Sequence, residues 1–367
     1  MRILYVSTLS ITINSFFKPH VEMLVNEGHH IDIACDYREL PIDNFFEELG
    51  CQYFQIDFSR SPLSTSNIRA YKQLQEVVEN GKYDIVHCHT PTAAAITRLA
   101  CIRYRKNRGL KVFYTAHGFH VYNGAPLKNW LIYYPIEKVC SYFTDKLITI
   151  NEEDYRLAKN KMKSNEVCYV PGVGVDISKF KDIKVDRNAK RQEIGVPKDC
   201  FLLLSVGELN ENKNHQIIIK ALAELNNPDV HYVIAGEGNK RDYLVNLTNS
   251  LGVAQQVHLL GYRKDIPELN HSADVFCFPS IREGLPVSLI EAMACGLPVI
   301  CSGIRGNVDL INSNGGVFFS AYRVDECKQA ITKILYRDND YMGNNNKAVI
   351  KKYSVDAVLD IMRKIYL

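Results

Sequence analysis

Residues 280–301, SIREGLPVSLIEAMACGLPVIC, decide the fold of this chain. They follow a strongly apolar run, Val275–Phe278, whose residue types are typical of a buried strand. Pro286 suits the first position of a helix, because its missing N–H costs nothing there, and Gly296 can end that helix before a second apolar strand at 299–301. The order of strand, loop, helix and strand predicts an open α/β sheet, in which ligands bind in the loops at the carboxyl ends of the strands.

Two glutamates in this stretch have the chemistry of a sugar-nucleotide site. Glu283 lies in the loop before the helix, and Glu291 lies inside the helix, with seven residues between them. A helix N-terminus offers free N–H groups to a phosphate, while carboxylates accept hydrogen bonds from sugar hydroxyls and from a ribose diol. Position alone leaves a second interpretation open, in which Glu283 is a helix-start carboxylate and Glu291 a solvated helix residue.

The context of the glutamates carries a family resemblance. The segments S-x-x-E-G-L-P at 280–286 and L-I-E-A-M-A-C-G-x-P-V at 289–299 closely resemble the donor-site signature of family 4 glycosyltransferases. The resemblance covers nearly the whole chain. It implies the α/β GT-B fold, with two doubly wound, Rossmann-like domains facing each other across a cleft. It also implies that Glu283 holds donor sugar hydroxyls and Glu291 holds the ribose. The same signature places four further residues at the donor: Arg282, Gly284, Leu285 and Pro286.

Composition bounds the class of protein. With 367 residues, 46% hydrophobic and 23% charged, the chain suits two globular domains, and a net charge of +3 gives no indication of nucleic-acid binding. Residues 1–10 are too short and too polar for a signal peptide, and no apolar run reaches membrane-spanning length. The 11 cysteines form no C-x-x-C pair. This pattern favours a reducing cytoplasm, so we expect a cytoplasmic protein that can be peripheral on the inner face of the cell membrane.

The first half begins with an apolar strand at 2–7, followed by an expected loop at 8–15. We interpret this as an acceptor-side loop that acts through Thr12 and Asn14. A second strand, 83–89, ends with His87 and His89, which share a face because they are two residues apart.

Further histidines follow at His117, in T-A-H-G, and at His120. The four histidines could imitate a zinc site, but no third clearly placed ligand, carboxylate or thiolate spacing supports one. The family resemblance instead assigns His117 to the donor sugar, and we expect His89 and His120 on the acceptor side. We expect no metal. The D-x-D at 338–340 is interpreted as a surface loop.

A basic run extends from Arg98 to Lys111, RLACIRYRKNRGLK. It is either a solvated helix face or a surface attracted to an anionic membrane, with help from the aromatic residues of 128–134 and above all Trp130.

The domain boundary is expected in the glycine- and proline-containing segment 167–180. By resemblance the last helix crosses back to the first domain. The predicted domains are therefore 1–170 plus 353–367, on the acceptor side, and 171–352, on the donor side.

The second domain opens with a strand and the loop 207–214, GELNENKN, which suits a phosphate because a glycine loop precedes a lysine at a helix start. In the family, an arginine directly after Gly207 and a later lysine hold the donor diphosphate. Lys213 matches, but Glu208 stands in place of the arginine, so Arg282 or Arg305 is expected to supply the missing cation. The resemblance extends the donor site to Asn212, to Gly236 in a G-x-G that lacks a third glycine, and to Tyr262 near the nucleobase.

The resemblance thus implies a retaining, metal-independent glycosyltransferase, with His117, Glu283 and Lys213 as catalytic residues. Its donor would be a UDP-sugar, with UDP-N-acetylhexosamine favoured by the exopolysaccharide and capsule subgroup that it resembles. Its acceptor would be an undecaprenyl-diphosphate-linked saccharide. Two alternatives stay open: a nucleotide-sugar epimerase on the same fold, and a non-catalytic sugar-nucleotide-binding partner subunit, which Glu208 keeps in view.

Overall fold

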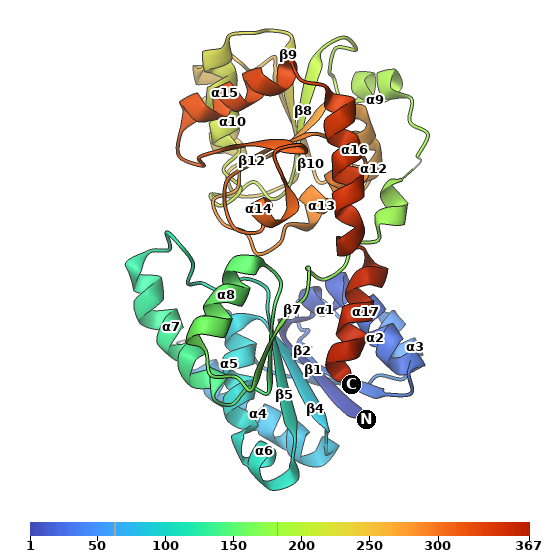
Figure 1. Ribbon diagram of the computed structural model, residues 1–367, viewed down its shortest axis with the longest axis vertical. Coiled ribbons are helices and arrows are strands. Elements are labelled where there is room, and N and C mark those ends of the chain that lie inside the picture. Colours follow the sequence, from blue (N-terminus) through green and yellow to red (C-terminus); the bar gives the residue numbers. More distant parts are fainter. Residues whose placement is uncertain (62–63, 182) are drawn as a thin grey trace. The chain divides into compact units, whose positions relative to one another are not determined.

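The computed structural model describes residues 1–61, 64–181 and 183–367. The chain divides into two compact units (Figure 1). Unit 1 comprises Met1–Gly174 and Val355–Leu367, and unit 2 comprises Val175–Ser354. The division expected from the sequence, after residue 170 and before residue 353, lies close to these boundaries.

Unit 1 is built on one parallel sheet in the order β3-β2-β1-β4-β5-β6-β7. The central strands β1 and β4 are almost wholly buried, as expected for a parallel sheet covered on both faces. Alternate side chains of β1 enter different cores: Leu4 and Val6 pack on one face of the sheet, and Ile3 and Tyr5 on the other. The strands are β1 (Arg2–Leu9), β2 (His30–Asp36), β3 (Tyr53–Gln55), β4 (Ile85–His89), β5 (Lys111–Ala116), β6 (Lys146–Thr149) and β7 (Glu166–Tyr169).

Helices cover both faces of this sheet. They are α1 (Ser10–Phe16), α2 (Lys18–Asn26), α3 (Asn44–Glu48), α4 (Ser66–Gly81), α5 (Pro91–Ala100), α6 (Ile102–Arg108), α7 (Leu127–Ser141), α8 (Glu152–Lys161) and α17 (Val355–Tyr366). The loop expected at 8–15 is wrong: residues 10–16 form α1, because Ile13 is fully buried against the sheet. Helix α17 returns to unit 1 and buries Val358 and Met362.

Unit 2 repeats the same design, with the sheet order β10-β9-β8-β11-β12-β13. Its strands are β8 (Phe201–Val206), β9 (Val230–Ala235), β10 (Val257–Gly261), β11 (Val275–Phe278), β12 (Val299–Ser302) and β13 (Gly316–Phe319). Its helical segments are η1 (Ile177–Phe180), α9 (Arg187–Glu193), α10 (Gln216–Leu225), α11 (Arg241–Ser250), α12 (Ile266–Ser272), α13 (Val287–Ala294), α14 (Asn307–Leu310), α15 (Val324–Leu335), α16 (Asn339–Val349) and η2 (Ile350–Tyr353).

Each sheet has one point where the strand order reverses, between β1 and β4 in unit 1 and between β8 and β11 in unit 2. In open α/β sheets, ligands bind at such switch points, beyond the carboxyl ends of the strands. We therefore expect ligands to bind near four loops, those that follow β1, β4, β8 and β11.

The structure bears on two expectations from the sequence, one about membrane-spanning segments and one about the D-x-D at 338–340. Among the described residues, no helix combines the length and apolar character needed to cross a membrane. The D-x-D at 338–340, interpreted as a surface loop, is instead the start of α16, where the Asp338 side chain accepts a hydrogen bond from the Tyr341 N–H as an N-cap.

Candidate functional site

The switch point of unit 2 is formed by two loops that are tied together. One is the loop 207–214 after β8, and the other is the loop 279–286 after β11. The Ile281 N–H donates to the Asn212 carbonyl at 2.8 Å, and the Asn212 side-chain amide donates to the Arg282 carbonyl at 2.9 Å. Asn212, predicted as a donor-binding residue, thus holds the two loops in register.

Lys213 and Glu283 meet between these loops. The Lys213 ammonium lies 2.8 Å from Glu283 Oε1 and 4.7 Å from the centre of the Phe278 ring. Arg305, which is almost fully buried, donates from Nε to the Glu283 backbone carbonyl at 3.0 Å. Glu283 is therefore fixed by a cation at its carboxylate and by a second cation at its backbone. Sequence reasoning placed all three residues at the donor, and the structure brings them together.

Glu291 lies on α13, which begins directly after the second loop. Burial raises the pKa of its carboxyl to about 7. Within the described ranges, no residue donates a hydrogen bond to this carboxylate. A partly buried carboxylate without a donor is unfavourable unless a ligand supplies one, and the two hydroxyls of a ribose would do so.

The switch point of unit 1 contains a cavity of about 290 Å³. Its lining is rich in hydroxyls and consists of Thr8, Leu9, Ile11, Thr12, Arg60, Thr90, Pro91, Thr92, His120 and Tyr133. The Thr8 N–H donates to Thr90 Oγ1 at 3.0 Å, which joins the ends of β1 and β4. Thr90 has a φ of 64°, unusual for a β-branched residue, and such strained backbone tends to occur at functional sites. Thr12 and His120, both predicted on the acceptor side, line this cavity.

Two family models match this chain, one within each of the two units. The sequence matches the family described as "Glycosyl transferase 4-like" over residues 2–151 and the family described as "Glycosyl transferases group 1" over residues 186–354. EpsD of Bacillus subtilis (strain 168), named as a glycosyltransferase, is 37% identical over 322 residues, which cover 86% of this chain and 82% of EpsD. The chain belongs to the 4-like, group 1 glycosyltransferases.

More distant relatives support the same assignment. A galactosyltransferase of Escherichia coli, named for UDP-Gal and for α-D-GlcNAc-diphosphoundecaprenol, is 27% identical over 85% of this chain and 82% of its own. The crystal structure of HepE of Anabaena in complex with UDP has a TM-score of 0.78 at 18% identity, covering 100% of this chain and 99% of HepE. WaaG, a lipopolysaccharide glycosyltransferase, has a TM-score of 0.74 at 18% identity, covering 99% of both chains. The predicted GT-B fold class is confirmed.

Several predicted donor-site residues of this glycosyltransferase do not present side chains to a ligand. The side chains of Leu285 and Pro286 are buried in unit 2. A Cβ atom at Gly236 would lie 1.9 Å from the Gly207 carbonyl oxygen, so glycine is needed at position 236, where β8 and β9 end side by side. The carbonyl oxygen of Gly284 is also closely packed, because a Cβ atom at Gly306 would lie 2.4 Å from it. Donor-binding roles for Leu285 and Pro286 therefore stay predictions, with contact to a donor available only through their main-chain atoms.

Three further predicted donor residues are exposed. Glu208 bends back on its own loop, where its carboxylate accepts from the Asn210 amide at 2.9 Å. Arg282 is exposed in the second loop, and Tyr262 is 68% exposed at the carboxyl end of β10. The negative charge of Glu208 is thus held by a neutral amide, and Lys213 and Arg305 are the cations that contact Glu283.

Two residues predicted on the acceptor side do not line the 290 Å³ cavity, and their acceptor roles stay predictions. Asn14 faces the segment 41–43: its amide donates to the Pro41 carbonyl at 2.9 Å, and its oxygen accepts from the Asp43 N–H at 3.1 Å. His89 is 1% exposed and lies outside the lining of the 290 Å³ cavity. Arg60, Thr90 and Thr92 were missed, although the two threonines directly follow a predicted strand end, which was a usable signal.

The histidines form a buried network rather than a metal site. His87 contacts the Tyr366 hydroxyl through Nδ1 and the Thr115 hydroxyl through Nε2, the latter at 2.8 Å. His89 Nδ1 lies 3.3 Å from His117 Nε2. Within the described part of the chain, no three His, Cys, Asp or Glu side chains are placed to hold a metal ion. Burial lowers the pKa of His117 to about 4, with His20 adding to the decrease, so this ring is neutral near pH 7.

This network predicts the tautomer of His117. His89 Nε2 is buried without a partner, and a bare acceptor is tolerated there better than an orphaned N–H. His89 should therefore carry its proton on Nδ1 and donate it to His117 Nε2, which leaves the His117 proton on Nδ1. We expect ¹⁵N NMR of histidine-labelled protein at pH 7 to show the Nδ1–H form of His117, and a His89→Ala variant to lose this preference. An Nε2–H form in the wild type would contradict the prediction.

The basic run 98–111 is divided between surface and core: Arg103, Lys106, Arg108 and Lys111 are exposed, whereas Arg98 and Arg105 turn inward. Arg98 is fully buried and donates to Glu137 Oε2 at 2.9 Å. Arg105 binds Asp145 through two hydrogen bonds, and Arg108 pairs with Glu79. Trp130 is partly buried and packs against the core of unit 1. Arg98, Arg105 and Trp130 are thus engaged within unit 1, and contact of this run and Trp130 with a membrane stays a prediction.

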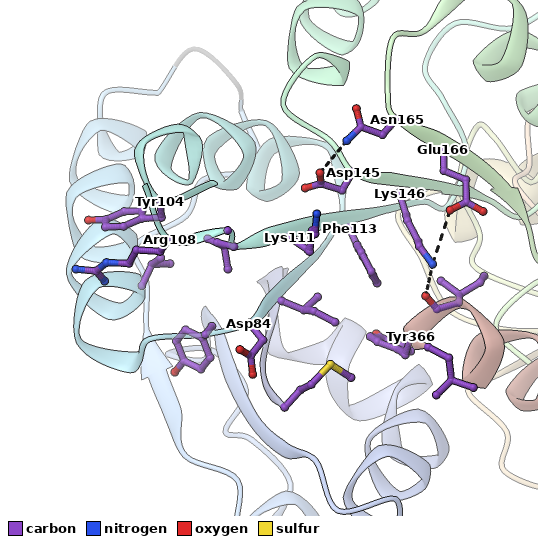
Figure 2. Close-up of a pocket in the computed structure, with 18 of the residues that line it drawn as sticks. Asp84, Tyr104, Arg108, Lys111, Phe113, Asp145, Lys146, Asn165, Glu166 and Tyr366 are labelled. Carbon is purple, nitrogen blue, oxygen red and sulfur yellow. Dashed lines mark hydrogen bonds and ion pairs between the residues drawn. The ribbon is translucent and has the colours of Figure 1, made fainter. Parts of the chain in front are cut away.

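A second cavity of unit 1, with a volume of about 810 Å³, lies at the other end of the strands (Figure 2). Its lining includes the first residues of β4, β5, β6 and β7, so it is at the amino ends of the strands. The Lys146 ammonium has partners within this cavity: it donates to the Ile365 carbonyl at 2.6 Å and lies 3.7 Å from the Glu166 carboxylate (Figure 2). Because ligands of such sheets bind at the carboxyl ends, we do not assign the active site to this cavity.

Proposed function

We propose that this glycosyltransferase is retaining and metal-independent, and that it moves a sugar from a UDP-sugar to a lipid-linked saccharide in exopolysaccharide or capsule synthesis. The observation that carries the proposal is the Lys213–Glu283 pair, braced by Arg305 and followed by Glu291, at the switch point of unit 2. The Escherichia coli relative is named for a UDP-sugar and a diphosphoundecaprenol acceptor. A Campylobacter jejuni relative, 26% identical, is named as an N-acetylgalactosaminyltransferase, which supports UDP-N-acetylhexosamine as the donor.

The geometry suggests a role for each group. Glu291 would accept hydrogen bonds from the ribose hydroxyls, and Glu283 would accept them from the donor sugar. Lys213 and Arg305 would stabilise the negative charge that develops on the leaving diphosphate, so that fixed cations perform the electrostatic work. The bond between the anomeric carbon and the β-phosphate oxygen breaks, a new bond forms to the acceptor hydroxyl oxygen, and the acceptor proton passes to the leaving phosphate.

The cavity at the switch point of unit 1 would take the polar head of the acceptor. Its threonine hydroxyls can bind phosphate or sugar oxygens, and Arg60 adds an exposed positive charge at the rim. A diphosphate that links a saccharide to a lipid has this chemistry.

The direct test is to assay transfer. The protein is incubated with a panel of UDP-sugars and a synthetic polyprenyl-diphosphate saccharide, with and without EDTA, and the product linkage is determined by NMR. The proposal predicts one preferred UDP-sugar, an unchanged rate in EDTA and the same anomeric configuration in donor and product. Interconversion of UDP-sugars without acceptor would indicate an epimerase, and UDP binding without turnover would indicate a non-catalytic subunit.

The raised pKa of Glu291 predicts a pH-dependent affinity for UDP. Ribose hydroxyls donate to the ionised carboxylate, so UDP binding must expel the proton that Glu291 holds below its pKa of about 7. If binding restores an ordinary glutamate pKa, the affinity should fall roughly tenfold from pH 8 to pH 6. Calorimetry with wild type and Glu291→Gln separates this effect from the titration of UDP itself, which both share. Parallel pH profiles for the two proteins would contradict the assignment.

A further inference from the structure

The solvent face of α7 is apolar. Helix α7 lies at the outer flank of unit 1 in Figure 1. Six large hydrophobic residues on α7 and just after it are exposed, each by more than a third of its surface: Leu127, Leu131, Ile132, Ile136, Val139 and Tyr142. Leu131 and Ile132 are adjacent, and the other successive members are three or four residues apart, so the six cover one broad side of the helix, which we call the α7 apolar face. Contiguous exposed apolar surface of this kind marks a binding surface rather than an ordinary soluble face.

The other side of α7 is already occupied. Asn129, Glu137 and Cys140 are buried against unit 1, and Trp130 and Tyr133 pack on its core. The buried side of the helix thus includes polar groups with partners in unit 1, and rotating the helix to hide the α7 apolar face would expose or break these contacts. A helix with this pattern is fully satisfied only when an apolar medium covers its second side.

The charges around the α7 apolar face are cationic. Glu137 is the acidic residue of α7, and it is buried and paired with Arg98, so it adds no negative charge to the surface. Lys128 is exposed on the helix itself. Lys138 donates to the Lys161 carbonyl, and the Lys163 N–H donates to Ser141 Oγ at 2.8 Å. Lys161 and Lys163, both exposed, therefore lie beside the end of α7 and extend its basic border.

The α7 apolar face adjoins the acceptor cavity. Tyr133 lines that cavity, and its ring stacks on His120 at a centroid distance of 4.3 Å. The side-chain amide of Asn129, one helical turn before Tyr133, donates to the His120 carbonyl at 3.0 Å. Ile132, the neighbour of Tyr133, belongs to the exposed face. One helix thus provides a wall of the polar cavity and the apolar surface beside it.

We propose that the α7 apolar face binds an anionic lipid bilayer, with its side chains in the interface and its border lysines on lipid phosphates. Apolar burial combined with lysine–phosphate attraction is the way in which interfacial helices hold a bilayer. Building on the proposed function, this contact would bring the cavity to the depth at which the head of a lipid-linked acceptor emerges.

Flotation tests the contact directly. Wild type, the variant Leu131→Asp/Val139→Asp and the control Val245→Asp are each mixed with vesicles of phosphatidylcholine alone or with 30% phosphatidylglycerol. Val245 is an exposed apolar residue on α11, outside α7. We expect wild type and control to float with the anionic vesicles, less so in high salt, and the α7 variant to lose at least nine-tenths of its bound fraction. Equal flotation of all three proteins, or none by the wild type, would overturn the proposal.

Two further measurements separate the possible causes of a loss. Leu131→Ser/Val139→Ser keeps the helix without adding charge, and it should bind vesicles with intermediate strength. Light scattering in the absence of vesicles reports self-association; a wild-type dimer that the variants dissociate would show that a second copy covers the face, against the proposal. Transfer to a short-chain, water-soluble diphosphate acceptor should be equal in wild type and variants. If none of them transfers sugar, the proposed function fails while the flotation result still stands.

Discussion

Replacing Lys213 with alanine is expected to lower kcat for sugar transfer by about 10²–10³-fold, the usual effect of removing one preorganised charge from a leaving-group site. The Lys213 ammonium lies 2.8 Å from Glu283 Oε1 and is held over the Phe278 ring, so its position is set before the donor arrives. Its attraction to the diphosphate grows as the bond to the sugar breaks. Steady-state kinetics with a saturating UDP-sugar should therefore show the loss in kcat more than in KM.

The control for this prediction lies on the same side of unit 2. Lys240 is a second lysine near the loop 207–214, where it pairs with Glu211 at 2.6 Å. Lys240→Ala removes a positive charge from a surface ion pair of small energetic value, so kcat should stay near wild type. Lys213→Arg should recover part of the lost rate because it restores the charge. A Lys213→Ala enzyme within threefold of wild type would remove Lys213 from the catalytic residues.

The donor side could be predicted from the sequence for a topological reason. Lys213 and Glu283 are 70 positions apart, but each lies in a loop directly after a buried strand. In a doubly wound sheet, β8 and β11 are neighbours at the switch point, so their following loops must meet. Strand patterns and loop positions are local features, and the topology rule converts them into a contact.

The acceptor side was less predictable because its contacts depend on distant partners. Asn14 turns to the segment 41–43, a choice that its own neighbourhood in the sequence does not reveal. The basic run shows the same dependence: local charge density suggests a solvated face, which holds for Arg103 and Lys106, whereas Arg98 and Arg105 turn inward to partners 39 and 40 positions later. The α7 apolar face was missed because the polar residues Asn129 and Glu137 lie on the buried side of the helix, so its pattern does not show which side faces solvent.

Replacing Glu137 with alanine is expected to lower the free energy of unfolding of unit 1 by about 3–5 kcal/mol, because the change leaves the Arg98 charge buried and unpaired. Arg98 has no exposed side-chain surface, and its guanidinium lies 4.2 Å from the centre of the Tyr114 ring. Glu137 also accepts from the Tyr114 hydroxyl at 3.1 Å, so the variant orphans a second buried polar group. Urea unfolding followed by tryptophan fluorescence measures the effect, since the chain has one tryptophan, Trp130, on α7 itself.

The double variant Arg98→Met/Glu137→Leu distinguishes the cost of an unpaired charge from the value of the pair. Taking two charges out of water costs several kcal/mol per ion, so an apolar pair of similar volume should be far less destabilising than Glu137→Ala alone. If the double variant is as unstable as the single one, packing rather than charge determines the loss. The pair also joins α5 to α7 from within the core. Glu137→Ala should therefore loosen α7 and weaken vesicle binding together with stability, whereas the double variant should keep both.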